Sequence, residues 1–372
     1  MISKPTHVGE AHPLRKITWC SVRPLSACLC LLVTVALLST AGCDQKTVHS
    51  SGPIAISGET MGTLYNIKIA EPPRGTTREE LTSKIEAELD RINDQMSTYR
   101  SESEISRFNR HEAKHWFEVS PETAQVVQEA LLVSEVSGGA FDITVGPLVN
   151  LWSFGPESRD RTVPTDQEIR TAMTRVGYHN LQVRISPPAL RKLKGDIRID
   201  LAAIAKGFGV DQIAELLART GISGYIVEIG GEIRAHGSKP GGSSWRVGIE
   251  TPTEGRFGIQ EVLSLNNGAL ATSGDYRNFF KADGKRYSHT IDPQTGRPVE
   301  HDLASVTVIA DNCMKADAWA TALMVLGPEK GYQLARDRGL AVLFLIRGGE
   351  GFVRRATPAF NDLAPQEEKA RS

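Results

Sequence analysis

Two oxygen-bearing side chains stand out in segment 315–327, which is otherwise apolar and rich in alanine. The segment has no Gly or Pro before Gly327-Pro328, so it predicts a helix that ends there. Asp317 and Thr321 are four residues apart and therefore lie on one face, near the helix start. A buried carboxylate is costly unless something compensates its charge. Carboxylate and hydroxyl oxygens suit Mg²⁺, which also keeps water and phosphate oxygens as ligands.

The same pair of residues also has an interpretation without a metal. Asp317 would cap its helix or pair with a buried Lys or Arg, and Thr321 would hydrogen-bond back to a backbone carbonyl. The local sequence does not decide between this arrangement and a magnesium site.

A second helix is expected over 201–219, after a short strand at 197–199 that ends at Asp200. Gly207 and Gly209 lie within this helix, although a glycine costs about 1 kcal/mol of helix stability relative to Ala. Their presence implies that another backbone or a ligand comes close. Lys206 adds positive charge to the positive end of the helix dipole, which is unfavourable unless an anion such as a diphosphate binds there. The alternative is a solvated lysine on a surface helix.

Asp142 follows a Gly-Gly-Ala-Phe turn at 138–141. Its carboxylate would either bond a ribityl or ribose hydroxyl or simply cap the turn, and the sequence leaves both open.

The rest of the chain mixes helical and strand patterns without a 20–50-residue repeat. Helices are expected at 78–95, 103–109, 121–137, 165–175 and 332–338, strands at 64–69, 224–229, 245–249, 259–265, 304–309 and 341–346, and a hairpin turn at 283–284. There is no Gly-x-Gly-x-x-Gly after a strand, no P-loop and no His-Glu-x-x-His. A bound nucleotide would therefore not lie in a Rossmann or P-loop cradle.

Length and composition limit the class of protein. The 372 residues, 40% of them hydrophobic, suffice for one large domain or two intimately packed ones. A net charge of −1 and only 6% aromatic residues argue against a nucleic-acid partner, since neither a basic surface nor base-stacking platforms are indicated.

The N-terminus has the layout of a signal peptide. Basic residues, among them Arg15, Lys16 and Arg23, precede the apolar run 25–38, which is too short to span a bilayer comfortably. Segment 38–43 resembles a bacterial lipobox ending at Cys43, although Thr40 replaces the usual aliphatic residue. We expect a removed signal peptide at 1–42 and a lipid-anchored tether at 43–53, the alternative being a signal without lipid. Asp44 resembles an inner-membrane retention signal, which predicts lipid anchoring on the periplasmic side.

The five cysteines agree with this reading. Three lie in the segment expected to be removed and Cys43 would carry lipid, so Cys313 remains alone. Neither a disulfide framework nor a cysteine-based metal site is expected.

Seven segments, taken together and in order, resemble the ApbE family, the FAD:protein FMN transferases of bacterial envelopes. They are 58–65 around Met61-Gly62-Thr63, 96–100, 139–155, 200–207, 272–277, 288–293 and 316–322. The resemblance covers 54–360, which would be the catalytic domain, followed by a polar tail at 361–372. It implies an α+β fold related to the T-fold, with mixed sheets flanked by helices and an FAD cleft between two packed subregions.

The resemblance also implies a reaction. FAD would bind with Mg²⁺, a threonine hydroxyl of a target protein would attack the phosphorus of the FMN half, and AMP would leave. The family's usual targets are flavoprotein subunits of membrane redox pumps, such as the sodium-translocating quinone reductase and the Rnf complex.

The family's functional residues map onto matching positions of this chain. FAD would contact Met61, Tyr99, Ala140, Phe141, Asp142, Asp200, Lys206 and Ile291. Mg²⁺ would be held by Asp317, Thr321 and the backbone carbonyl of Ala203. His289 matches a histidine implicated in catalysis, where it would take the threonine proton or only bond a phosphate oxygen.

Three rival functions remain at this point. An FAD pyrophosphatase would use the same metal site with water in place of threonine. A flavin-binding lipoprotein without turnover needs no metal, so the Asp317 and Thr321 pair counts against it. A generic solute-binding lipoprotein has no positive feature in the sequence.

Overall fold

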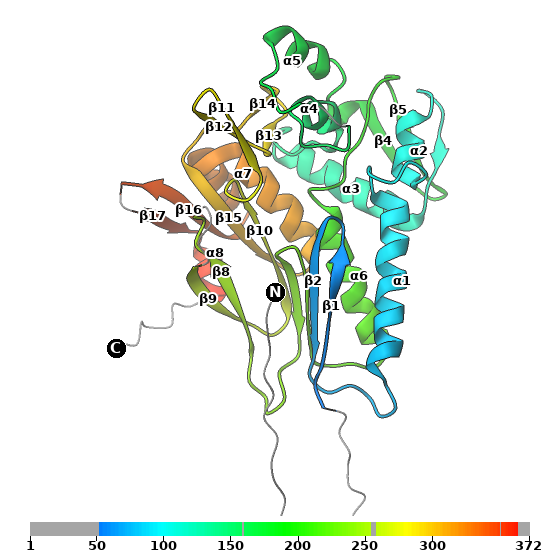
Figure 1. Cartoon of the computed structure of the whole chain (residues 1–372), viewed down its shortest axis with the longest axis vertical. Coiled ribbons are helices and arrows are strands. Elements are labelled where there is room, and N and C mark those ends of the chain that lie inside the picture. Colours follow the sequence, from blue (N-terminus) through cyan, green and yellow to red (C-terminus); the bar gives the residue numbers. More distant parts are fainter. Residues whose placement is uncertain (1–51, 158–159, 254–257, 350, 364–372) are drawn as a thin grey trace, which may run out of the picture. The chain divides into compact units, whose positions relative to one another are not determined.

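An eight-stranded antiparallel sheet, in the strand order β1-β2-β6-β7-β10-β15-β16-β17, forms the centre of the structure (Figure 1). Its strands are β1 Ile54–Thr60, β2 Thr63–Ile69, β6 Tyr225–Ile229, β7 Glu232–His236, β10 Gly268–Gly274, β15 Leu303–Ala310, β16 Ala341–Gly348 and β17 Gly351–Ala356. Two-residue turns, Met61-Gly62 and Gly230-Gly231, join β1 to β2 and β6 to β7. All four turn residues have positive φ, as tight hairpins require.

The computed structural model describes residues 52–157, 160–253, 258–349 and 351–363, which belong to one compact unit. The predicted signal peptide and Cys43 lie outside these residues. Within the described ranges, no helix is both long enough and apolar enough to cross a membrane.

The two faces of the central sheet are covered differently. Helices α1 (Arg78–Met96), α6 (Ala205–Arg219) and α7 (Cys313–Asp337) pack on one face. The hairpin β8 (Trp245–Glu250) and β9 (Ile259–Leu265) packs on the other face, with α8 (Pro358–Leu363). Successive residues of β10 show the alternation, because Leu270 joins the core under the hairpin while Ala271 joins the core under α7. Helix α8 extends to Leu363, and its residues from 361 onward, which fall in the predicted polar tail, are exposed.

A second group of elements lies beyond the end of the sheet (Figure 1). It contains α2 (Glu104–Arg110), α3 (Pro121–Val136), η1 (Ile143–Val145), α4 (Gly146–Leu151), α5 (Asp166–Met173), η2 (Tyr178–Asn180), and the sheet of β3 (Phe117–Glu118), β5 (Pro188–Lys192) and β4 (Leu181–Ile185). The hairpins β11 (Phe279–Ala282) with β12 (Lys285–Ser288), and β13 (Ile291–Asp292) with β14 (Arg297–Pro298), complete it.

Side-chain caps explain where several helices begin. The hydroxyls of Thr77, Ser120 and Thr165 accept backbone N–H bonds at the starts of α1, α3 and α5. At α5, Glu168 returns the bond to Thr165 and completes a capping box.

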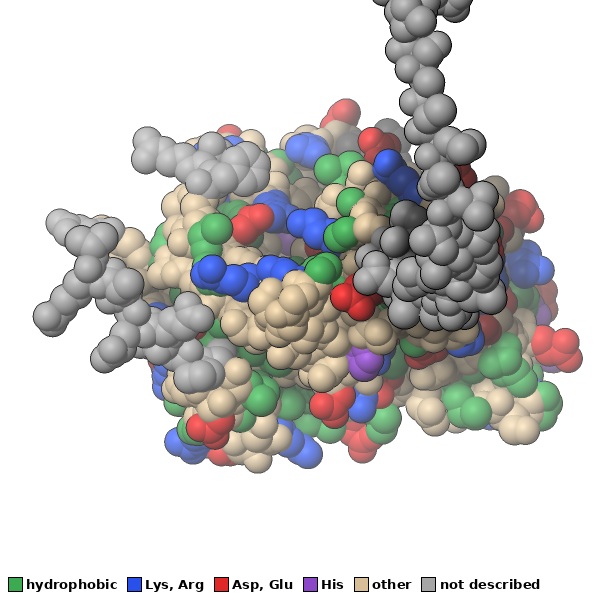
Figure 2. Space-filling view, turned by 90° about the horizontal axis from the view of Figure 1, so that it is seen from below, with side chains coloured by type: hydrophobic (Ala, Val, Ile, Leu, Met, Phe, Trp, Pro, Cys, Tyr) green, Lys and Arg blue, Asp and Glu red, His purple; other side chains and the backbone are tan. Residues whose placement is uncertain are grey.

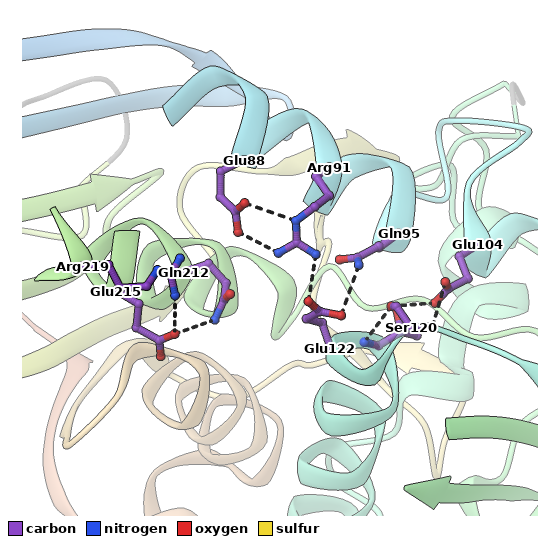
Figure 3. A network of polar contacts seen from close by, with 10 residues as sticks. Glu88, Arg91, Gln95, Glu104, Ser120, Glu122, Gln212, Glu215 and Arg219 are labelled. Carbon is purple, nitrogen blue, oxygen red and sulfur yellow. Dashed lines mark hydrogen bonds and ion pairs between the residues drawn. The ribbon is translucent and has the colours of Figure 1, made fainter. Parts of the chain in front are cut away.

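A polar network joins α1 to α3 (Figure 3). Arg91 of α1 lies 2.7 Å from Glu88 and 3.0 Å from Glu122 at the start of α3. Glu104 of α2 accepts hydrogen bonds from the backbone and hydroxyl of Ser120. Because the Arg91 pairs are partly exposed, they orient the helices more than they stabilise them.

Three sequence predictions of elements need correction. The strand expected at 197–199 is absent from the described structure, where the Asn109 side-chain amide bonds both the N–H and the carbonyl of Ile199, each at 2.8 Å. The helix expected from residue 201 begins at Ala205. The helix expected to end at Gly327 is only kinked there, with φ 77° and ψ −177°, and resumes after Pro328.

Figure 2 shows the face seen from below in Figure 1. Basic and acidic side chains are interspersed over it. On this face the mixture agrees with the near-neutral net charge of the chain.

Candidate functional site

Helices α6 and α7 come into backbone contact at Gly207. A Cβ atom at this position would lie 2.3 Å from the Cys313 carbonyl oxygen and 2.8 Å from the Asp317 Cβ. Glycine is therefore required by the neighbouring helix, as the sequence predicted for a close backbone. The Gly207 N–H also donates to Asp317 Oδ2 at 3.0 Å.

The start of α7 is held in turn by a carboxylate of α6. Asp211, which is buried, accepts N–H bonds from Cys313 at 3.0 Å and Met314 at 2.9 Å. Its Oδ1 atom also pairs with Arg234 of β7 at 2.7 Å. Asp211 thus fixes the first turn of α7, and Asp317 stands one turn further along.

Three oxygen atoms at this contact are available to bind a cation. In a regular helix the Gly207 N–H would bond the Ala203 carbonyl, but it bonds Asp317 instead, and the Ala203 oxygen lacks that helix bond. Within the described residues, neither Asp317 Oδ1 nor the Thr321 hydroxyl makes a hydrogen bond, and Asp317 forms no ion pair. The alternative that pairs Asp317 with a basic residue and bonds Thr321 back to a carbonyl is therefore not realised.

This donor set fits a hard cation. Carboxylate, hydroxyl and carbonyl oxygens are ligands of Mg²⁺, which completes its shell with water and phosphate oxygens. Over the described ranges, no group of three or more His, Cys, Asp or Glu side chains could hold a metal. The ligands of such a cation would be a single carboxylate, Asp317, together with the Thr321 hydroxyl and the Ala203 carbonyl.

Lys206, whose side chain is 28% exposed, forms an ion pair with the buried Glu232 beside Asp317. Lys206 Nζ contacts Glu232 Oε1, and the Glu232 side chain is only 4% exposed. Burial acts to lower the pKa of Lys206, but the charges of Glu232 and Asp317 raise it overall, so the ammonium is retained. Burial and the charge of Asp317 raise the pKa of Glu232 to about 7, against the opposing effect of Lys206. The interpretation of Lys206 as a solvated surface residue is wrong.

His289 lies near this group with a defined tautomer. Its Nδ1 is 3.0 Å from the Asn278 carbonyl oxygen. Because a carbonyl can only accept, Nδ1 carries the proton and Nε2 keeps its lone pair. Burial lowers the pKa of His289, and the charge of Lys206 adds to this lowering. The neutral ring is therefore the resting form at neutral pH.

The Asp142 carboxylate accepts hydrogen bonds from other residues of the chain. It accepts bonds from the Thr144 N–H at 2.7 Å, the Thr144 hydroxyl at 2.6 Å and the Tyr178 N–H at 2.9 Å. The turn-capping interpretation is thus realised, and a contact of Asp142 with FAD stays a prediction. Asp200 lies next to it, because the Asp200 N–H donates to the Ile143 carbonyl at 2.7 Å.

Tyr99 lies beside Phe154, whose ring contacts the histidine. It is 70% exposed, and its hydroxyl is 3.4 Å from the Phe154 carbonyl oxygen. The Phe154 ring lies edge-on to His289, with ring centroids 6.3 Å apart. An exposed aromatic ring in this position could stack on a planar ligand.

The remaining predicted FAD contacts are mostly buried. Ala140, Phe141 and Ile291 are 2–6% exposed, and Ile291 packs with Trp152. Met61 sits in the β1–β2 turn, and its terminal methyl would lie 3.0 Å from a Cβ at position 209. Their contacts with FAD stay predictions.

Two cavities lie elsewhere. One of about 410 Å³ is lined by residues of α4 and α5, including Leu151, and by Arg175. The other, of about 650 Å³, is lined by residues around β9 and α8, including Leu265 and Leu363. Neither is lined by a residue predicted to bind FAD or metal. The predicted site is therefore located by its polar side chains and not by either of these cavities.

Sequence reasoning missed two residues of this centre. Asp211 follows Gly207 by four residues, so the same-face rule that joined Asp317 to Thr321 could have found it. Glu232 directly follows the Gly230-Gly231 turn, which places its carboxylate at a sheet end, but nothing in the sequence points that end toward Lys206.

The chain was compared with known sequences. The sequence model of the ApbE family matches residues 61–344. A Vibrio cholerae protein named FAD:protein FMN transferase is 45% identical over 332 residues, which are 89% of this chain and 97% of that protein. An Escherichia coli K12 protein of the same name is 40% identical over 345 residues, 90% of this chain and 98% of that protein.

Solved structures agree with the sequence comparison. The flavin transferase ApbE from Vibrio cholerae has a TM-score of 0.78 and 44% identity, covering 84% of this chain and 99% of that chain. The apo form of Pseudomonas stutzeri flavinyl transferase ApbE has a TM-score of 0.78 and 41% identity, and the match covers 85% of this chain and 98% of that chain. The predicted α+β class is confirmed, and this chain belongs to the ApbE family.

Proposed function

We propose that the protein transfers FMN from FAD to a threonine hydroxyl of target flavoproteins and releases AMP. The observation that carries the proposal is the contact of α6 with α7, which gathers Lys206, Asp317 and the free Ala203 carbonyl. A cation and an ammonium at one place suit a diphosphate, whose cleavage needs positioning and charge stabilisation. The names of the relatives support FMN transfer from FAD to a protein.

Each residue has a proposed task. Asp317, Thr321 and the Ala203 carbonyl would hold Mg²⁺, which when bound neutralises charge on the diphosphate and orients the leaving group. Lys206 would bind a phosphate oxygen. Tyr99 would stack on a ring of the bound dinucleotide.

The covalent step breaks the bond between the two phosphates of FAD and forms an oxygen–phosphorus bond to the target. The threonine hydroxyl attacks the FMN phosphorus, and its proton passes to His289 Nε2. AMP leaves with the oxygen of the broken bond, and FMN stays joined to the protein by a phosphoester.

The role of His289 predicts a pH dependence. Because burial and Lys206 hold its pKa below the ordinary 6.5, the base stays neutral throughout the neutral range. We expect kcat to fall only in acid, with a midpoint below pH 6.5. His289→Gln should lower kcat by about 10²-fold or more and abolish this acid limb. An unchanged acid limb in the variant would assign the titration to another group.

Incubation with FAD, Mg²⁺ and a subunit of the sodium-translocating quinone reductase or Rnf type tests the function. Transfer gives in-gel flavin fluorescence on the subunit and an intact mass increased by one FMN unit. A subunit whose acceptor threonine is replaced by Ala is the control and should stay unlabelled. Release of free FMN and AMP with no labelled subunit would instead establish an FAD pyrophosphatase.

We also propose that the enzyme works at the periplasmic side of the inner membrane, anchored through Cys43. Support comes from the lipobox-like segment 38–43 and from Asp44 after it. Cys43→Ala should move the protein from the membrane fraction to the soluble periplasmic fraction, as measured by immunoblotting. An unchanged distribution would exclude lipid anchoring at this cysteine.

A further inference from the structure

Lys206 has two carboxylates within electrostatic reach but contacts only one. Its ammonium pairs with Glu232, while the charge of Asp317 also acts on it. Among the described side chains, Lys206 and Asp317 form no ion pair. The position of the ammonium therefore decides whether Asp317 is free for a cation or occupied by a lysine.

Glu232 depends on Lys206 more than Asp317 does. Glu232 Oε2 is buried without any hydrogen-bond partner, so the ammonium is the partner that compensates this carboxylate. Asp317 accepts the Gly207 N–H as well. Leaving a buried carboxylate unpaired is costly, so the ammonium stays on Glu232.

The fold fixes where Glu232 stands. The Gly230-Gly231 turn, with positive φ at both residues, pairs Ile229 with Glu232 and places Glu232 first in β7. Strand β7 and α7 both pack against α6, which carries Lys206. Glu232 is thus held in a paired strand, with its side chain only 4% exposed beside Lys206.

We propose that Glu232 is a positioning residue that holds Lys206 away from Asp317 and so keeps Asp317 available to a divalent cation. Without the Glu232 charge, the ammonium turns to Asp317, the remaining carboxylate that attracts it, and competes with the metal. This inference rests on the proposed metal-dependent function.

Direct metal binding provides the test. Mn²⁺ is titrated into the folded protein without flavin, and free Mn²⁺ is measured by electron paramagnetic resonance. We expect Glu232→Gln to weaken Mn²⁺ binding by about tenfold or more. We expect the double variant Glu232→Gln/Lys206→Met to regain most of that loss, because the competing cation is gone. A purely structural role for Glu232 would not be rescued by removing Lys206.

The control is Glu261→Gln, which breaks a similar partly buried pair with Arg354 between β9 and β17, 2.9 Å apart. It should bind Mn²⁺ like the original protein. Unchanged Mn²⁺ affinity in Glu232→Gln, or a double variant as weak as the single one, overturns the proposal.

Two further outcomes are informative. If Glu232→Gln does not fold, Lys206→Met becomes the test: binding at least as tight as in the original protein supports the proposal, and weaker binding overturns it. Flavinylation of the target is measured separately. A protein that binds Mn²⁺ with the expected variant pattern but labels no target retains this inference and loses the proposed transferase function.

Discussion

Asp317→Ala removes FMN transfer from a protein that still folds. We expect kcat/KM to fall by about 10³-fold or more, because loss of the metal carboxylate removes several kcal/mol of charge stabilisation. The measurement is in-gel flavin fluorescence of the target over time, with circular dichroism to establish folding. Activity equal to that of the original protein would remove metal catalysis through Asp317 from consideration.

Asp317→Asn separates the metal role from the structural one. The amide oxygen can still accept the Gly207 N–H, now 3.0 Å from Oδ2, but it carries no charge. Burial raises the pKa of Asp317, so the folded protein binds its proton more tightly than the unfolded chain does. The ionised carboxylate therefore lowers stability at neutral pH, and its contribution improves as pH falls. We expect Asp317→Asn to lose activity and keep or raise the free energy of unfolding.

Gly207→Ala should destabilise the protein, although alanine is the better helix former. The intrinsic preference favours Ala by about 1 kcal/mol. The added methyl, however, would lie 2.3 Å from the Cys313 carbonyl oxygen, which belongs to the backbone and cannot rotate away. We expect a net loss of about 2 kcal/mol or more in the free energy of unfolding, measured by urea denaturation. Transfer activity should fall as well, because α6 and α7 must separate.

Gly209→Ala in the same helix is the matched control. Its added methyl would meet Met61 Cε at 3.0 Å, the mobile end of a flexible side chain. Met61 can move, so the helix preference should dominate and stability should be unchanged or slightly higher. Equal losses from both substitutions would show that backbone contact at position 207 is not the cause.

Local signals were sufficient for much of the fold. Strand β9 spans the predicted 259–265, and α1 differs from its prediction by one residue. Strand 197–199 was wrong because its partner is the Asn109 side chain, 90 residues away in sequence. No local pattern reveals that an amide group replaces a neighbouring strand.

The candidate site divides in the same way. The sequence predicted that Asp317 and Thr321 share one helix face, because they are four residues apart. It also predicted a close approach at the glycines of α6. The ion pair of Lys206 was not predicted, because Glu232 belongs to β7, which follows α6 only after strand β6 and a turn. For Asp142, the sequence held both alternatives, and the tertiary contact with Tyr178 accounts for its carboxylate.

Helices α6 and α7 are joined at their starts by reciprocal hydrogen bonds, in which a carboxylate of each helix accepts backbone N–H groups of the other. Asp211 of α6 receives amides of α7, and Asp317 of α7 receives an amide of α6. If the two helices separate, the backbone N–H groups of Gly207, Cys313 and Met314 all lose their hydrogen-bond acceptors. We therefore expect the amide protons of Gly207, Cys313 and Met314 to exchange with solvent together, through one opening event. The backbone of the predicted site is consequently held by contacts within the chain itself, without a bound dinucleotide.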